Sequence, residues 1–153
     1  NKLMINAQQI KELREKTGVS VSICKKALEE AGGEMDKALA VLQRESAKSA
    51  EKKADRTLGS GVIEAYVHNN KKVGVLLELK SESDFVSGNE EFRALAKDIA
   101  MHIAASAPSD LSELLGQPYI KNPAVTVKEL LNQAVQKFGE KIEVSRFVKY
   151  NLS

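Results

Sequence analysis

The chain contains 153 residues, of which 42% are hydrophobic and 29% are charged, and its formal net charge is +2. This composition is typical of a globular protein of one or two small domains, and it argues against a disordered or membrane-embedded chain. The small net charge also argues against a surface that is basic overall and binds nucleic acid.

Cys24 is the only cysteine, and His68 and His102 are the only histidines. A single cysteine excludes an internal disulfide, which suits a reducing compartment. One cysteine and two histidines are too few soft ligands for a zinc site. Because there is no apolar run of membrane-spanning length and no signal-peptide pattern, we expect a cytoplasmic protein without a metal, a cofactor or a membrane segment.

Apolar residues at helical spacing predict a small module of three helices over residues 1–45. The first helix begins at a capping box formed by Asn6 and Gln9 and ends at Thr17-Gly18. The other two are expected at about 22–31 and 35–44, and glycines between the helices supply the turns.

Residues 46–60 mix lysine, arginine, glutamate, alanine and serine, and they predict an exposed helical linker that ends at Gly59-Ser60-Gly61. The alternative is a basic segment that contacts phosphate or an acidic partner, although Glu51 and Asp55 dilute its charge. From residue 61 the apolar period changes to two, which predicts a β-hairpin over 61–80.

The corner after this hairpin carries the least expected residues of the chain. Asp84-Phe85 lies between a strand and a helix predicted from about 89 to 106, where a loop is normally small and polar. Phe85 either packs under the helix or is offered to a partner, and Asp84 either accepts local hydrogen bonds or faces that partner.

The remaining sequence completes an α+β core domain over residues 61–153. In the helix at 89–106, His102 falls at the margin of the apolar stripe and Met101 on its opposite side. A helical turn at 109–116, an edge strand at 117–120, a helix from a Thr126–Glu129 capping box to Gly139 and a last strand at about 142–150 follow. We expect a small antiparallel sheet covered by helices on one face.

Motifs for catalysis are missing. The sequence contains neither glycine-rich phosphate-binding pattern. Cys24 lies on a predicted helix between apolar residues, so we expect an inert buried thiol. A hydrolase would need Cys24 and a histidine to converge, and no spacing in the sequence demands it. We therefore expect a protein that is not an enzyme.

Several motifs, in the same order along nearly the whole chain, resemble those of the bacterial elongation factor Ts family. They are Leu13-Arg14-Glu15-Lys16-Thr17-Gly18, Cys24-Lys25-Lys26-Ala27-Leu28, Ser83-Asp84-Phe85-Val86, Ala100-Met101-His102-Ile103-Ala104-Ala105, Gln117-Pro118-Tyr119 with Val127-Lys128-Glu129-Leu130, and Arg146-Phe147. The resemblance implies that the N-terminal module is similar to a ubiquitin-associated domain.

The resemblance also implies a guanine-nucleotide exchange factor for elongation factor Tu, without direct nucleotide binding of its own. Phe85 would be a wedge that enters the partner's GTPase domain near the Mg²⁺ and the phosphates, with Asp84 beside it as a polar anchor. The further partner contacts that it implies are Ser83, Val86, Met101, His102, Arg14, Thr17 and Gly18.

Two departures from the family pattern bear on these expectations. Val19-Ser20 stands where the family has Ala-Gly, which affects docking of the N-terminal module. Only about ten residues join Ala107 to Gln117, where relatives carry a long helical segment or a second core half. A short chain with a single core half is also compatible with a homodimer. The rival interpretation is an adaptor that binds the ribosome through residues 48–56 and shows salt-sensitive RNA binding.

Overall fold

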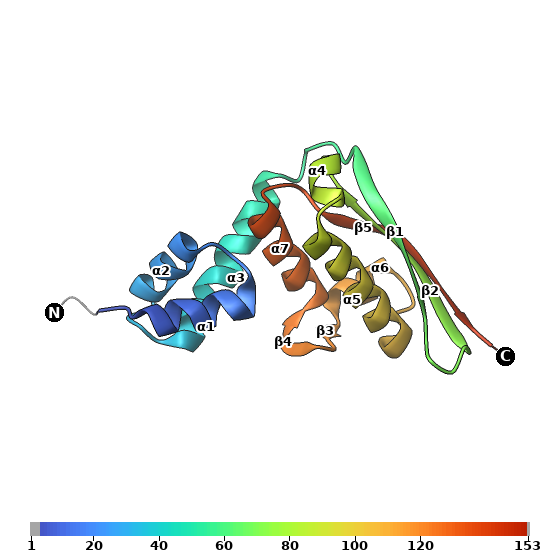
Figure 1. Ribbon diagram of the computed structural model, residues 1–153, viewed down its shortest axis with the longest axis horizontal. Helices are drawn as coiled ribbons and strands as arrows, with labels where there is room; N and C mark the ends of the chain where they lie inside the picture. Colours follow the sequence, from blue (N-terminus) through green and yellow to red (C-terminus); the bar gives the residue numbers. More distant parts are fainter. Residues whose placement is uncertain (1–3, 153) are drawn as a thin grey trace. The chain divides into compact units, whose positions relative to one another are not determined.

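The computed structural model describes residues 4–152 (Figure 1). The chain divides into two units, one formed by Asn1–Ala54 with Asn132–Gly139 and the other by Asp55–Leu131 with Glu140–Ser153. Residues 1–3 of the predicted N-terminal module and residue 153 of the predicted core domain lie outside the described residues.

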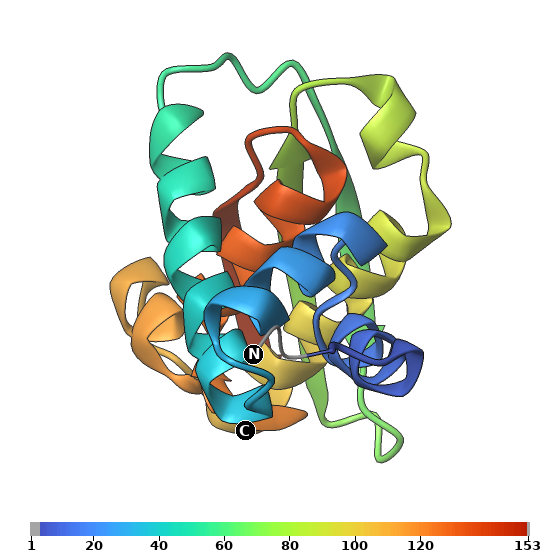
Figure 2. The same cartoon turned by 90° about the vertical axis from the view of Figure 1, so that its left-hand side faces the viewer.

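The first unit contains helices α1 (Ala7–Thr17), α2 (Val21–Glu30) and α3 (Met35–Lys52), which are blue to cyan in Figure 2. The capping box predicted at Asn6 and Gln9 is confirmed, because each side chain accepts a hydrogen bond from the other residue's backbone N–H. The three helices bury a common apolar core that includes Leu13, Leu28 and Leu42.

Helix α3 is longer than the sequence predicted, and it takes up the first part of the predicted linker. Ser46 on this helix is buried, and its hydroxyl donates a hydrogen bond to the side chain of Gln136. No glycine or proline interrupts residues 44–52, so the helix continues until Lys52. The prediction of one exposed helix ending at Gly59 is therefore wrong, since residues 53–59 are not helical.

The second unit is built on a three-stranded antiparallel sheet with the order β1-β2-β5. Its strands are β1 (Ser60–Val67), β2 (Val73–Ser81) and β5 (Glu143–Asn151). Helix α5 (Glu90–Ser106) packs against β1 and β2 on one face of the sheet. Val75, Leu77 and Leu79 are buried on that face because they alternate along β2. The α+β prediction and the hairpin prediction are confirmed.

Short elements connect α5 to the last strand. Helix α4 (Asp84–Ser87) precedes α5, and helix α6 (Leu111–Gly116) follows it. Strands β3 (Pro118–Tyr119) and β4 (Asn122–Thr126) then form a small antiparallel hairpin, of which the sequence predicted only the first strand. Helix α7 (Val127–Phe138) begins at the predicted Thr126–Glu129 capping box. No helix within residues 4–152 is long and apolar enough to cross a membrane.

Candidate partner-binding site

The corner segment, residues 82–88, presents Phe85 to solvent. Its side chain is 88% exposed, whereas Val86 and Ser87, the next two residues of α4, are buried. Leaving a phenylalanine in water forgoes roughly 1.5–3 kcal/mol of burial free energy. Of the two interpretations that the sequence left open, packing of Phe85 under the helix is therefore wrong.

The Asp84 carboxylate is exposed but is held by strand β1. The Ser60 hydroxyl donates a hydrogen bond to Asp84 Oδ1 at 2.6 Å. The same hydroxyl lies 2.7 Å from the Ser87 hydroxyl, so both ends of α4 are tied to the start of β1. One carboxylate oxygen of Asp84 is thus engaged within the protein, and its direction beside Phe85 is fixed.

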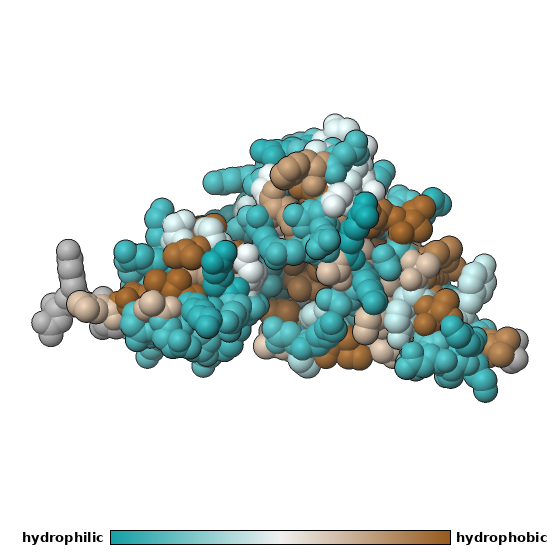
Figure 3. Space-filling model, viewed as in Figure 1, coloured by the Kyte–Doolittle hydropathy of each residue, from teal (hydrophilic) through white to brown (hydrophobic). Residues whose placement is uncertain are grey.

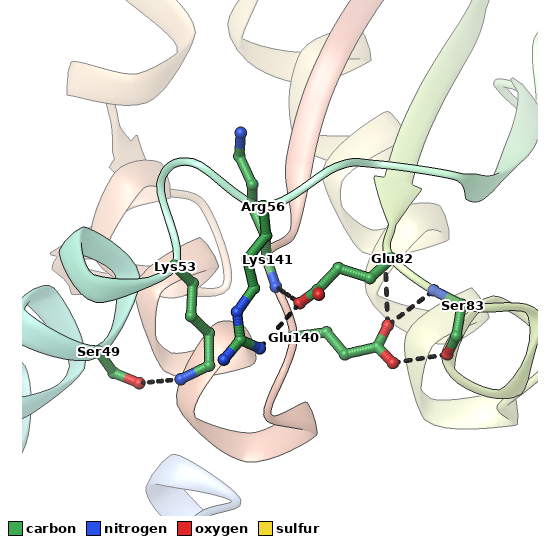
Figure 4. Close-up of polar contacts among 7 residues, drawn as sticks. All are labelled: Ser49, Lys53, Arg56, Glu82, Ser83, Glu140 and Lys141. Carbon is green, nitrogen blue, oxygen red and sulfur yellow. Dashed lines mark hydrogen bonds and ion pairs between the residues drawn. The ribbon is translucent and has the colours of Figure 1, made fainter.

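A second carboxylate, that of Glu140, holds the backbone just before Phe85 (Figure 4). Glu140 Oε1 accepts hydrogen bonds from the backbone N–H groups of Glu82 at 3.1 Å and Ser83 at 3.0 Å. Glu140 Oε2 accepts one from the Ser83 hydroxyl at 2.5 Å. These three hydrogen bonds join segments that are 57 and 58 residues apart in the chain.

The Glu82 carboxylate, in turn, contacts the segment that carries Glu140. Glu82 Oε2 accepts a hydrogen bond from the backbone N–H of Lys141 at 2.6 Å and lies 3.3 Å from Arg56 Nη1. We call the set of Arg56, Glu82, Ser83, Glu140 and Lys141 the carboxylate latch. The latch is not visible in the sequence, because no local pattern pairs Glu140 with a corner so far away in the chain.

The Ser83 hydroxyl is both a hydrogen-bond donor and a hydrogen-bond acceptor. The hydroxyl donates to Glu140 and accepts a hydrogen bond from the backbone N–H of Val86 at 3.3 Å, which makes Ser83 the N-cap of α4. Ser83 therefore caps the helix that carries Phe85 and also joins the start of this helix to Glu140.

His102 is not at the helix margin that the sequence predicted. Its side chain is fully buried. His102 Nδ1 accepts a hydrogen bond from the backbone N–H of Ile120 at 3.1 Å, so Nε2 carries the proton and donates to Gln117 Oε1 at 2.9 Å. The expectation that a partner reaches His102 on this surface is thus corrected, because the hairpin of β3 and β4 covers that side of α5. Met101 is half-buried.

The three predicted contact residues of the N-terminal unit differ in exposure. Arg14 is exposed. Thr17 is buried, and its hydroxyl donates a hydrogen bond to the backbone carbonyl of Leu13 at 2.8 Å. Gly18 ends α1 with a φ of 71°, in the left-handed region that favours glycine. Of these side chains, only that of Arg14 offers a charged group to a partner.

The predicted inertness of Cys24 agrees with its surroundings. Its side chain is fully buried, and this burial raises the pKa of the thiol above its ordinary value, so the thiol is neutral near pH 7. Within residues 4–152 no three His, Cys, Asp or Glu side chains are grouped as metal ligands.

The sheet face opposite α5 carries large apolar side chains that are exposed among the described residues of the second unit. This outer sheet face is made by five large exposed side chains: Ile63, Val67, Leu76, Val148 and Tyr150. The Arg146 guanidinium pairs with the Glu78 carboxylate on it at 3.0 Å. A pocket of about 290 Å³ on this sheet is lined by Ile63, Leu76, Val148 and the Glu78–Arg146 pair, together with Leu77 and Phe147. Figure 3 shows brown groups along the side formed by β1 and β2.

Comparison with known proteins gives a consistent family. A family model described as elongation factor TS matches residues 7–113 and 82–153, so residues 82–113 take part in both matches. The elongation factor Ts of Thermodesulfovibrio yellowstonii is 40% identical, and the alignment covers 98% of this chain and 97% of the relative. That of Carboxydothermus hydrogenoformans is 39% identical over 97% of this chain and 89% of the relative.

The relatives are longer within the aligned region. Both alignments run over 194 residues, more than the 153 residues of this chain. The relatives therefore contain residues that have no counterpart in this chain.

Proposed function

Because the chain belongs to the elongation factor Ts family, we propose that it promotes release of GDP from elongation factor Tu by inserting Phe85 into the GTPase domain of that protein. Exchange-factor function in translation elongation follows from the family. The insertion of Phe85 is our proposal for the molecular mechanism of exchange, and it requires no covalent chemistry. We assign this action to the cytoplasm, and the protein acts as a binding factor, not as an enzyme.

The observation that carries the proposal is the exposure of Phe85 on the corner segment, which hydrogen bonds to Glu140 and Ser60 hold in place. An exposed aromatic ring on a short helix is already in position to fill a pocket, so binding sacrifices little conformational freedom. Aromatic side chains of this kind often contribute much of the binding free energy of an interface. Asp84 lies beside the ring with its direction fixed by Ser60, which suits a polar anchor.

The mechanism follows from how GTPases hold GDP. Backbone amides and Mg²⁺ bind the phosphates, so a ring that displaces the elements around them weakens nucleotide binding. The effect is reciprocal, because the factor and the nucleotide lower each other's affinity by the same ratio. The N-terminal unit, through Arg14 and the turn at Thr17-Gly18, would dock on the same GTPase domain and keep the factor bound while Phe85 acts.

We further propose that a second copy of this chain covers the outer sheet face. An apolar sheet face of this kind favours association. The relatives contain a segment that this chain lacks, and residues 82–113 match the family model twice, as a repeated core would do. In a homodimer the second copy would take the place of the second core half.

The oligomeric state tests this second proposal. Leu76→Lys places a charge on the outer sheet face, and we expect it to weaken the dimer about 100-fold or more, because the ammonium group would be buried without a partner. Light scattering coupled to gel filtration measures the mass, and Ala94→Lys, on an exposed position of α5, serves as the control. A wild-type chain that remains a monomer at high concentration would contradict the proposal.

Release of fluorescent GDP from elongation factor Tu tests the exchange function itself. We expect the wild-type chain to accelerate release and the acceleration to saturate with its concentration. A folded chain that binds elongation factor Tu or ribosomes without accelerating release would contradict exchange and favour the adaptor interpretation.

A further inference from the structure

We propose that Glu140 is a positioning residue for Phe85, and this inference rests on the proposed exchange function. Glu140 does not touch the Phe85 ring in the described contacts. It acts through the backbone of Glu82 and Ser83, which directly precede the helix that carries the ring.

The direction of the Phe85 ring is set by the segment that carries it. A ring that is 88% exposed has few contacts of its own, so its direction depends on the backbone of α4. That helix has only four residues, too few to be stable alone. Its start is held by the Ser83 hydroxyl and by two backbone N–H groups, and all three donate to the Glu140 carboxylate.

The two carboxylates of the latch bind each other's backbone segments. Glu140 accepts from the backbone N–H of Glu82, and Glu82 accepts from the backbone N–H of Lys141, the residue after Glu140. Each carboxylate therefore fixes the backbone that carries the other. Hydrogen bonds to charged acceptors are about twice as strong as neutral ones. Such a paired arrangement restrains both segments, whereas a single cap would restrain only one.

The latch contains two negative charges, on the carboxylates of Glu82 and Glu140. Like charges repel, which would loosen the latch. The Arg56 guanidinium lies 3.3 Å from Glu82 Oε2 and offsets this repulsion (Figure 4). The latch therefore combines groups from three parts of the chain, and the corner is the place where they meet.

The test compares GDP release from elongation factor Tu over a range of factor concentrations for three variants. Glu140→Ala removes all three acceptor contacts, and we expect it to lower the saturating rate about tenfold. Glu140→Gln keeps an oxygen for the two backbone N–H groups, so we expect it to restore the rate to within about threefold of wild type. Glu113→Ala is the matched control, because Glu113 is exposed on α6 and its side chain accepts a hydrogen bond from Ser109, outside the latch.

The concentration dependence separates positioning from a loss of fold. Partial unfolding lowers the concentration of active factor, so it raises the half-saturating concentration and leaves the saturating rate unchanged. A misdirected Phe85 lowers the saturating rate itself. A Glu140→Ala variant with the wild-type saturating rate would overturn the inference.

Hydrogen exchange on the free protein distinguishes this inference from the proposed function. We expect the backbone amides of Glu82 and Ser83 to exchange at least about tenfold faster in Glu140→Ala than in wild type. If these amides keep their protection, the latch does not depend on Glu140 and the inference fails. If the amides lose protection but the wild-type chain does not accelerate GDP release, the failure lies in the proposed function.

Discussion

Phe85 and His102 are both expected to contact a partner because of the motifs that contain them, but the structure gives their side chains opposite surroundings. Phe85 is 88% exposed, and His102 is fully buried. In both places a hydrogen bond joins segments that are distant in the sequence. Glu140 accepts one from the backbone N–H of Ser83, and His102 accepts one from the backbone N–H of Ile120. The difference teaches that a motif match alone does not place a side chain at the surface: the Phe85 ring is exposed to solvent, whereas the His102 ring is enclosed by the rest of its unit.

The largest effect on stability is expected at His102. His102→Ala leaves the N–H of Ile120 and the Oε1 of Gln117 without their partner and opens a cavity, so we expect the free energy of unfolding to fall by about 2–4 kcal/mol. Urea denaturation measures this change. His68→Ala is the control, because His68 is exposed at the turn between β1 and β2. Equal stabilities for the two variants would contradict a supporting role for His102.

A smaller effect is expected at Ser83, the residue that joins the cap of α4 to the latch. Ser83→Ala removes the N-cap and the hydroxyl donor to Glu140, so we expect a loss of about 1–2 kcal/mol of unfolding free energy. Ser83→Thr keeps the hydroxyl and should remain close to wild type. If both variants denatured at the same urea concentration, the hydroxyl would not be the group that matters.

A pH-dependent effect is expected at Tyr119, which lies beside His102 in the hairpin region. Burial, and secondly the nearby Asp98 carboxylate, raise the pKa of Tyr119 to about 12. The unfolded chain ionises this group near its usual pKa of about 10. The stability linked to Tyr119 is therefore present below pH about 10 and is lost as the pH rises towards about 12.

Tyrosinate absorbance during an alkaline titration measures this ionisation. Comparison with Tyr119→Phe identifies the step that belongs to Tyr119. An ionisation of Tyr119 near pH 10 in the folded protein would show that the hairpin does not bury it.

The fold could be predicted where local signals decide it. The alternation along 73–79 identified β2, and the Asn6 and Thr126 capping boxes placed two helix starts correctly. The sequence did not show strand β4, because residues 122–126 contain a proline and little alternation. It also ended α3 too early, because the burial of Ser46 depends on Gln136, far away in the sequence.

The candidate site was predictable only in part, for the same reason. Asp84-Phe85 attracted attention because an aromatic residue is unusual in a short corner, and the structure places Phe85 in solvent. Neither Glu140 nor the burial of His102 could be derived from helical periodicity. Both result from contacts with segments that are brought close only by the fold.

The most direct test of the central claim is GDP release from elongation factor Tu with the Phe85→Ala variant. We expect the saturating rate to fall at least about tenfold. The free energy of unfolding should stay within about 0.5 kcal/mol of wild type, because the ring is exposed. Ile120→Ala, which truncates another exposed apolar side chain of the same unit, should exchange normally. A folded Phe85→Ala variant that releases GDP at the wild-type rate would contradict the account.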